Sequence, residues 1–171
     1  MSKAMTFLKM RAKQLHRLAA SGNDGALAYL SNRFTGPMDA ASVRRRHALA
    51  AVAGDAGFRG WPHAKAVLSG DPVDDFGTAL VPHRCMVHWN IWLASYEEAH
   101  AIRREKSGFL LAYRKDFVVV DDHFIVTLGL APEDADWKRM GRDWVHPADA
   151  PARDRLYLKL FRKQVDAAVV T

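Results

Sequence analysis

The sequence predicts an α+β fold dominated by helices: a four-helix module followed by a small three-stranded mixed sheet packed by helices. Apolar residues recur every three to four positions over most of the 171 residues, and they alternate or run together only near the middle of the chain. The chain is 49% hydrophobic and 26% charged, which is the usual balance of a globular protein. Folding at this length buries about 70% of the surface, so neither a disulfide nor a metal is needed for stability.

Charge divides the chain into two halves. Residues 1–70 carry eleven Lys and Arg against three Asp, a net charge of +8, whereas residues 71–171 carry fourteen bases against sixteen acids, a net charge of −2. We therefore predict a basic helical module, 1–70, and an α+β domain, 71–171, joined by the acidic loop 70–75. Such asymmetry indicates contact with phosphates or an acidic partner, or docking of the basic half on the acidic half of the same chain.

The first helix of the basic module is predicted from two stripes. Both stripes have helical spacing. The apolar stripe is Leu8, Ala12, Leu15 and Ala19, and the basic stripe is Lys9, Lys13 and Arg17. This basic leader without an acid also resembles a mitochondrial transit peptide. The helix-stop and helix-start chemistry of 21–24 favours a structural helix instead.

Three more helices follow in the basic module. Asp24 is expected to cap the second, and Asp39 or Ser42 to open the third. Gly57 is expected to end the third helix in the left-handed conformation, and Pro62 suits the first turn of the fourth. Leu49, Val52, Ala53 and Ala56 form the predicted buried stripe of the third helix.

The stretch HALAAVAGDAGFRGWPHAKAVL, with KMRAKQLHRLAASGNDGALAYL ahead of it, resembles a small helical module found at the start of uncharacterised proteobacterial proteins. That module precedes ankyrin repeats and occurs in proteins assigned to the glyoxalase superfamily. The resemblance covers roughly Lys3 to Leu68 and implies a helical fold without implying any chemistry. The stretches GFLLAYRKDFVVVDDHFIVTLGL and DWVHPAD resemble a small uncharacterised bacterial family.

The third and fourth helices also fit a helix-turn-helix pattern, in which the second helix enters a DNA groove. Its candidate contact residues for nucleic acid or an acidic partner are Arg59, His63 and Lys65 near the second helix, and Arg44, Arg45 and Arg46 on the first. The bulky Trp61 in the turn weakens the DNA interpretation and favours a packing role for that ring. The reading helix also lacks the Asn, Gln and Arg side chains that make most bidentate base contacts.

In the acidic half, residues 86–93 alternate as a half-buried strand does. The predicted core face is Val87, Trp89, Ile91 and Leu93, and the opposite face carries His88, Asn90 and Trp92. Ser95 is expected to cap the next helix reciprocally with Glu98 and the helix to end at Gly108. Residues 109–113 and 117–120 then predict a hairpin.

The tail is expected to be helical again. Asp121 or Asp122 caps a segment through Leu128, and Pro132–Asp134 opens a second segment that ends at Gly141. Pro151 begins the last helix, whose predicted apolar stripe is Leu156, Leu160, Phe161 and Val165.

Three kinds of chemistry are considered for the acidic half. His83, Cys85 and His88 are metal-ligand types, but no second ligand pair has zinc-site spacing, so no metal is predicted. Cys85 could be a nucleophile beside His88 or His123, although burial is the simpler expectation. The third possibility is a small-ligand site on the strand face: His88, Asn90 and Trp92, extended by Tyr113 and Arg114.

The leading hypothesis is a cytoplasmic, non-catalytic binding or adaptor protein whose basic module contacts an acidic partner or surface. The alternatives are nucleic-acid binding by the same module, and a ligand site or enzyme on the His88 face. The single cysteine fits a reducing compartment, no stretch is apolar enough for a membrane, and no cofactor signature occurs.

Overall fold

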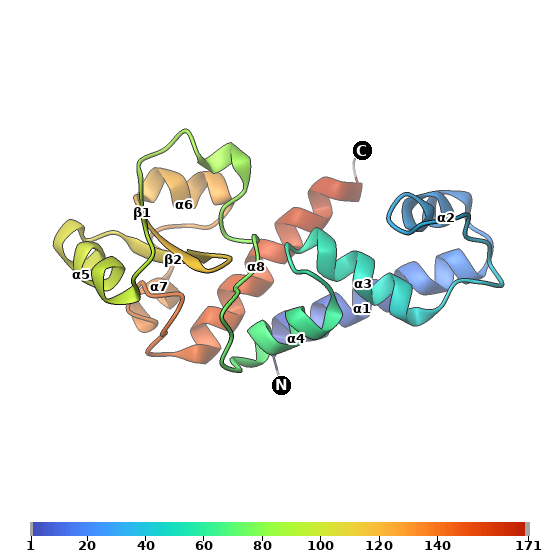
Figure 1. Ribbon diagram of the computed structural model, residues 1–171, viewed down its shortest axis with the longest axis horizontal. Helices are drawn as coiled ribbons and strands as arrows, with labels where there is room; N and C mark the ends of the chain where they lie inside the picture. The colour runs from blue at the N-terminus through green and yellow to red at the C-terminus, as the bar shows by residue number, and fades with distance from the viewer. Residues whose placement is uncertain (1, 170–171) are drawn as a thin grey trace.

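The structure is a computed structural model that describes the backbone of residues 2–169 and the side chains of residues 2–164. Its elements are α1 (Lys3–Ala20), α2 (Asp24–Ser31), α3 (Arg45–Asp55), α4 (Trp61–Ser69), η1 (His83–Cys85), β1 (Asn90–Leu93), α5 (Tyr96–Lys106), β2 (Phe109–Tyr113), β3 (Asp116–Val120), α6 (Asp122–Leu128), α7 (Ala135–Arg139) and α8 (Ala150–Val169). Figure 1 shows a helical lobe built from α1–α4, a lobe that contains the sheet, and α8 running from one lobe to the other. The predicted helix-dominated α+β class is confirmed.

The three strands form an antiparallel sheet in the order β1-β3-β2. β2 and β3 are joined by the predicted hairpin, in which Tyr113 pairs with Asp116, and β1 pairs with the other edge of β3. The prediction of a mixed sheet is therefore wrong. The chain returns to the sheet through α5 between β1 and β2, and β1 runs antiparallel to β3, its neighbour in the sheet.

The first strand is shorter than the alternating pattern predicts. Met86–Trp89 lie outside β1, and Val87 and Trp89 are 82% and 43% exposed instead of forming a core face. Pairing ends at Asn90 opposite Val120 because the next residue of the partner, Asp121, is the N-cap of α6. With no partner strand left, the chain forms a local turn in which the His88 N–H donates to the Cys85 carbonyl at 3.1 Å.

The sheet separates two apolar clusters. One face, with Leu110, Ala112 and Val119, packs on Ala99 of α5. The other face, with Leu111 and Val118, belongs to the main core, to which α6, α7 and α8 contribute. Leu156, Leu160 and Phe161 of the predicted α8 stripe are fully buried there, and Val165 lies outside the described side chains.

The main core extends into the helical lobe, so the two predicted halves share it. It contains Leu8 of α1 and Val52 of α3 together with residues of the sheet and α8. At the end of α3, Gly57 has φ +85° and its N–H donates to the Gly54 carbonyl at 3.0 Å, while the Phe58 N–H donates to the Ala53 carbonyl at 2.9 Å. This pair of bonds is a Schellman motif, as the sequence predicts. The domain boundary at Gly70 stays a prediction.

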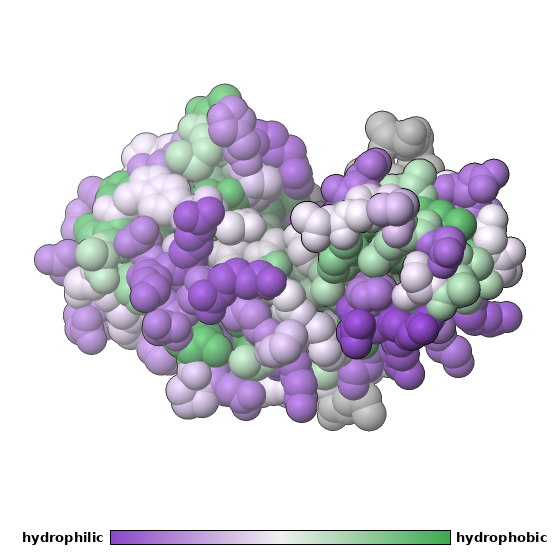
Figure 2. Space-filling model, turned by 45° about the vertical axis from the view of Figure 1, so that its right-hand side comes forward, coloured by the Kyte–Doolittle hydropathy of each residue, from purple (hydrophilic) through white to green (hydrophobic). Residues whose placement is uncertain are grey.

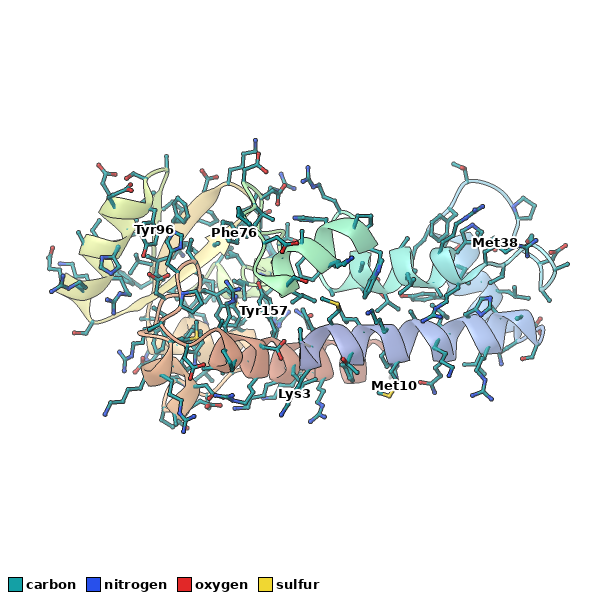
Figure 3. The ribbon with its side chains drawn as sticks, turned by 90° about the horizontal axis from the view of Figure 1, so that it is seen from below. Lys3, Met10, Met38, Phe76, Tyr96 and Tyr157 are labelled. Carbon is teal, nitrogen blue, oxygen red and sulfur yellow. The ribbon has the colours of Figure 1, made fainter. Side chains whose placement is uncertain are left out.

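The start of α1 is held by an acid from the far end of the chain. The carboxylate of Asp154 on α8 accepts from the Lys3 N–H at 2.6 Å, from the Ala4 N–H at 3.2 Å and from the Ser2 hydroxyl. Lys3 begins α1 beside α8 in Figure 3. These bonds satisfy helix N–H groups that have no partner within α1, so the leader segment is an integral helix of the fold.

Two helix starts differ from the prediction. Asn23, and not Asp24, caps α2, because its side chain accepts from the Ala26 N–H at 2.9 Å. Asp39 and Ser42 do not open α3, since each accepts from the other's backbone N–H in a turn, and the helix begins only at Arg45.

Other predicted helix boundaries lie within two residues of the structure: α5 ends at Lys106 instead of Gly108, and α8 begins at Ala150 instead of Pro151. Ser95 caps α5 as predicted, since its hydroxyl oxygen accepts from the Glu98 N–H at 3.4 Å. The hydroxyl donates to the Glu97 carboxylate at 3.0 Å, and among the described residues the Glu98 side chain makes no return bond to Ser95. Asp121 caps α6 and Gly129 follows it with φ +103°. Within residues 2–169, no helix has the length and apolar character needed to cross a membrane.

Candidate functional site

The most unusual electrostatic feature is a run of three arginines at the start of α3. Arg44, Arg45 and Arg46 are exposed, and Arg44 occupies the N-cap without a side-chain capping bond. Its guanidinium donates to the carbonyls of Ala41 and Val43 instead. A helix N-terminus carries partial positive charge, so cations are unfavourable there. The local fold therefore gains no dipole stabilisation from these side chains.

Desolvation and the positive charge at the start of α3 together lower the pKa of His47, in the first turn of the helix. Its Nδ1 accepts from the Arg44 N–H at 3.2 Å, and its ring packs at 5.3 Å from the Phe34 ring. Desolvation lowers the pKa of His47, and the charges of Arg46 and Arg44 lower it further. The expected result is a neutral imidazole, whose Nε2 lies 3.4 Å from Arg46 Nε.

Most bases of the helical lobe have no acid beside them. Of the eleven Lys and Arg in residues 1–70, only Arg33 and Arg59 form an ion pair within the described side chains. The other nine have none there; they are Lys3, Lys9, Arg11, Lys13, Arg17, Arg44, Arg45, Arg46 and Lys65. Figure 2 shows a band of hydrophilic side chains along the lower side of this lobe.

Two of the three residues predicted to contact DNA bases, His63 and Arg59, make contacts within the protein instead. The side chain of His63 is only 10% exposed; its Nδ1 accepts from the Arg59 N–H at 3.1 Å and its Nε2 lies 2.8 Å from the Asp75 carbonyl oxygen. Arg59 lies 3.5 Å from the Asp75 carboxylate. Lys65 remains exposed without an acid partner, but one lysine gives no base-reading surface.

Trp61 packs, as its size predicts. The ring is partly buried against the main core, and the Lys9 amine lies 5.9 Å from its centroid. α4 therefore faces inward at the turn where a DNA-reading helix would present its first side chains.

The predicted ligand face of β1 forms a chain of internal contacts. Trp92 Nε1 donates to Asn90 Oδ1 at 2.9 Å, Asn90 Nδ2 donates to the His88 carbonyl at 2.7 Å, and His88 Nε2 lies 2.6 Å from Thr127 Oγ1. The polar edges that could orient a ligand are thus bonded to neighbouring protein groups. This arrangement supports a structural role for the three residues.

Tyr113 and Arg114 do extend this strip. The Tyr113 ring meets the Trp92 ring edge-on at 5.5 Å, and the Arg114 guanidinium lies 5.4 Å from the Tyr113 centroid. Tyr113 also lines an open cleft of about 800 Å³ between the two lobes, with Thr78, His83 and Lys163 among the other lining residues. Among the main cavities of the described residues, none is lined by His88, Asn90, Trp92 or Arg114.

Cys85 is fully buried in the main core. Burial raises the pKa of its thiol, and the nearby Arg84 charge only partly opposes this effect. A nucleophilic cysteine needs a lowered pKa, so its environment does not favour thiolate chemistry. Within the described residues, no group of three His, Cys, Asp or Glu side chains is placed to hold a metal.

Two buried carboxylates of the second half, Asp136 and Asp143, were not identified from local sequence patterns. Asp136, 7% exposed, lies 2.7 Å from Arg155 and 3.3 Å from Lys159 of α8. Asp143, 5% exposed, accepts from the Tyr96 hydroxyl at 2.6 Å and from two backbone N–H groups. Their side-chain partners, Arg155 and Lys159 for Asp136 and Tyr96 for Asp143, lie 19 or more positions away, so no short-range pattern could identify these pairs.

Comparisons with protein-family models, with curated proteins and with solved structures each returned no match to this chain. The resemblance of the helical module to other proteins therefore stays a prediction, and the functional argument depends on the geometry above.

Proposed function

We propose that this chain is a cytoplasmic, non-catalytic binding or adaptor protein whose basic helical module contacts an acidic protein partner or surface. One observation carries the proposal: nine of the eleven Lys and Arg in residues 1–70 have no acid partner among the described side chains. Unpaired, exposed charge of one sign attracts a partner of the other sign.

Among the described side chains, the second half of the chain neutralises little of this charge. Between the two halves, Asp75 pairs with Arg59, and Asp154 binds backbone N–H groups at the start of α1 instead of a basic side chain. The lobes are held together by apolar packing of α1 and α8. The charges of Arg44, Arg45 and Arg46 are therefore not neutralised by any described acid, which supports contact with an acidic partner.

An acidic protein fits the surface better than DNA does. His63 is committed to internal hydrogen bonds and Arg59 to an ion pair, so α4 offers only Lys65 for base contacts. Carboxylates of a partner can meet separated cations on α1 and α3 without a groove-shaped fit.

The test is binding to poly-glutamate and to a random DNA duplex at low salt, measured by fluorescence anisotropy. The variant is the triple substitution Arg44→Gln, Arg45→Gln and Arg46→Gln. A matched control removes three exposed positive charges from the other half with Arg104→Gln, Lys138→Gln and Arg139→Gln. We expect the arginine triple to lose about 10-fold in poly-glutamate affinity, the sum of three surface pairs of about 0.5 kcal/mol each.

The control triple should keep the affinity of the unsubstituted protein. Equal losses in both triples, or no poly-glutamate binding at low salt, would overturn the proposal. Tighter binding to the duplex than to poly-glutamate, with a steep salt dependence, would replace it by the nucleic-acid alternative.

A further inference from the structure

A partly open cavity of about 260 Å³ lies between the helical lobe and α8, apart from the arginines of α3. Figure 1 shows α2 and the later turns of α8 on the same side of the α1–α3 pair, and residues of all four helices line the cavity. Its walls are mainly apolar and include Leu8, Leu15, Val52 and Phe161. An apolar cavity of about 150 Å³ already admits a benzene ring, so this space suits a molecule of roughly ten heavy atoms.

One acid lines the cavity, and its charge is neutralised within the protein. Asp55 accepts a hydrogen bond from the Tyr29 hydroxyl, and Arg33 Nη2 lies 2.5 Å from Asp55 Oδ1. The Arg33 guanidinium also lies 3.7 Å from the centroid of the Tyr29 ring. These three side chains form a closed polar cluster at one side of the cavity.

Arg11 is the cation that remains. It lines the same cavity, and its side chain bonds only the Gln14 amide oxygen, at 3.3 Å, among the described residues. Burial and the hydrogen bond to Asp55 raise the pKa of Tyr29, and the charges of Arg33 and Arg11 oppose that rise, which places Arg11 close to the cluster. The cavity therefore has an apolar interior and an uncompensated positive charge.

One polar atom at the cavity wall has no hydrogen-bond partner among the described residues. The side-chain oxygen of Gln164 is buried, lines the cavity and accepts no hydrogen bond from any described residue. Buried acceptors are almost always satisfied in folded proteins, so an orphaned one at the cavity wall indicates a missing donor, which a water beside a bound head group can supply and a carboxylate oxygen cannot.

We propose that this cavity binds a small amphipathic acid, with an apolar body of about eight carbons and a carboxylate that pairs with Arg11. The apolar walls match the body and the charge of Arg11 matches the head group. The site is separate from the binding surface proposed for Arg44, Arg45 and Arg46 and does not depend on it.

Isothermal titration with octanoate, and with 1-octanol as the uncharged equivalent, tests this site. We expect Arg11→Gln to weaken octanoate binding about 10-fold and to leave octanol binding unchanged. Lys13→Gln removes the same charge from an exposed position outside the cavity lining and should leave octanoate binding unchanged.

A second variant fills the cavity from its rim. Leu18 lines the space and is 45% exposed, so Leu18→Trp adds volume with little risk to folding. It should abolish binding of both molecules while thermal unfolding stays near that of the unsubstituted protein. The proposal fails if octanoate does not bind the unsubstituted protein at millimolar concentration, if Arg11→Gln and Lys13→Gln behave alike, or if Leu18→Trp binds normally.

Discussion

The two lobes use charged side chains in opposite ways. In the sheet-containing lobe, buried acids have structural partners: Asp136 binds Arg155 and Lys159, and Asp143 binds Tyr96 and backbone N–H groups. In the helical lobe, three arginines stand at the start of α3 without an acid. Buried charge in the sheet-containing lobe stabilises the fold, whereas most of the positive charge in the helical lobe, apart from Arg33 and Arg59, has no described acid partner.

The largest expected loss of stability comes from a substitution at Gly57, where the end of α3 closely approaches Ala79. A Cβ on Gly57 would lie 2.5 Å from the Ala79 backbone nitrogen, and its φ of +85° disfavours any side chain. Gly57→Ala should therefore lower the free energy of unfolding by about 3 kcal/mol in urea denaturation. Gly54→Ala is the matched control, because a Cβ there meets nothing within 4 Å. It should keep or raise stability; equal losses in the two variants would contradict the close approach.

Removing the charge of Asp136 tests the structural role of acids. Asp136→Asn should cost about 2 kcal/mol at pH 7, less than a fully buried pair, because Arg155 and Lys159 are partly exposed. Hydrogen bonds from Arg155 hold the pKa of Asp136 below its ordinary value of 3.8, although burial opposes them. The stabilisation is therefore complete above the ordinary pKa and is lost as pH falls through the lowered one.

Urea denaturation between pH 7 and pH 2 measures this difference. The gap in stability between the unsubstituted protein and Asp136→Asn should stay constant down to about pH 5 and close under more acidic conditions. Asp74→Asn is the control, since this carboxylate is 82% exposed beside Lys115, and it should change stability very little. A gap that persists at pH 2 would show that the effect of Asp136→Asn is not electrostatic.

Asp154 tests the link between the chain ends. Asp154→Ala removes the acceptor for the N–H groups of Lys3 and Ala4 and should cost about 1 kcal/mol, the usual value of a helix cap. Hydrogen exchange of the first turn of α1 should accelerate. Glu133→Ala, at an exposed acid before α7, should change neither quantity. Unchanged exchange in Asp154→Ala would mean that α1 is held by apolar packing alone.

The smallest expected change in the free energy of unfolding is an increase. Arg45→Glu places a negative charge in the first turn of α3, where the helix dipole favours it, and should raise stability by about 0.5 kcal/mol. The same change should weaken poly-glutamate binding. Lys65→Glu, beyond the first turn of α4, should not raise stability. A loss of stability in Arg45→Glu would show that this arginine has a structural role.

Local signals predicted most of the fold. Ser95, Asp121, Gly57 and Gly129 end or begin helices as their chemistry requires, and the hairpin follows from two apolar runs joined by Arg114 and Lys115. The strand at 86–93 was predicted too long because alternation does not reveal the length of the partner strand. β3 ends at Val120, so Trp89 has no residue to pair with.

The candidate sites were harder to predict for a similar reason. Charge counting located the surplus of positive charge in residues 1–70, but it could not show that His63 is bonded internally while Arg45 is exposed. The cluster of Tyr29, Arg33 and Asp55 joins residues more than twenty positions apart, through contacts that exist only after α2 packs beside α3.

The most direct test of the contrast between the lobes is urea unfolding of two matched triple variants at pH 7. One variant carries Arg44→Gln, Arg45→Gln and Arg46→Gln; the other carries Asp136→Asn, Asp143→Asn and Asp154→Asn. We predict that the arginine triple unfolds within about 0.5 kcal/mol of the unsubstituted protein, or is more stable. The aspartate triple should lose at least about 2 kcal/mol. An arginine triple that is destabilised as much as the aspartate triple would contradict the account.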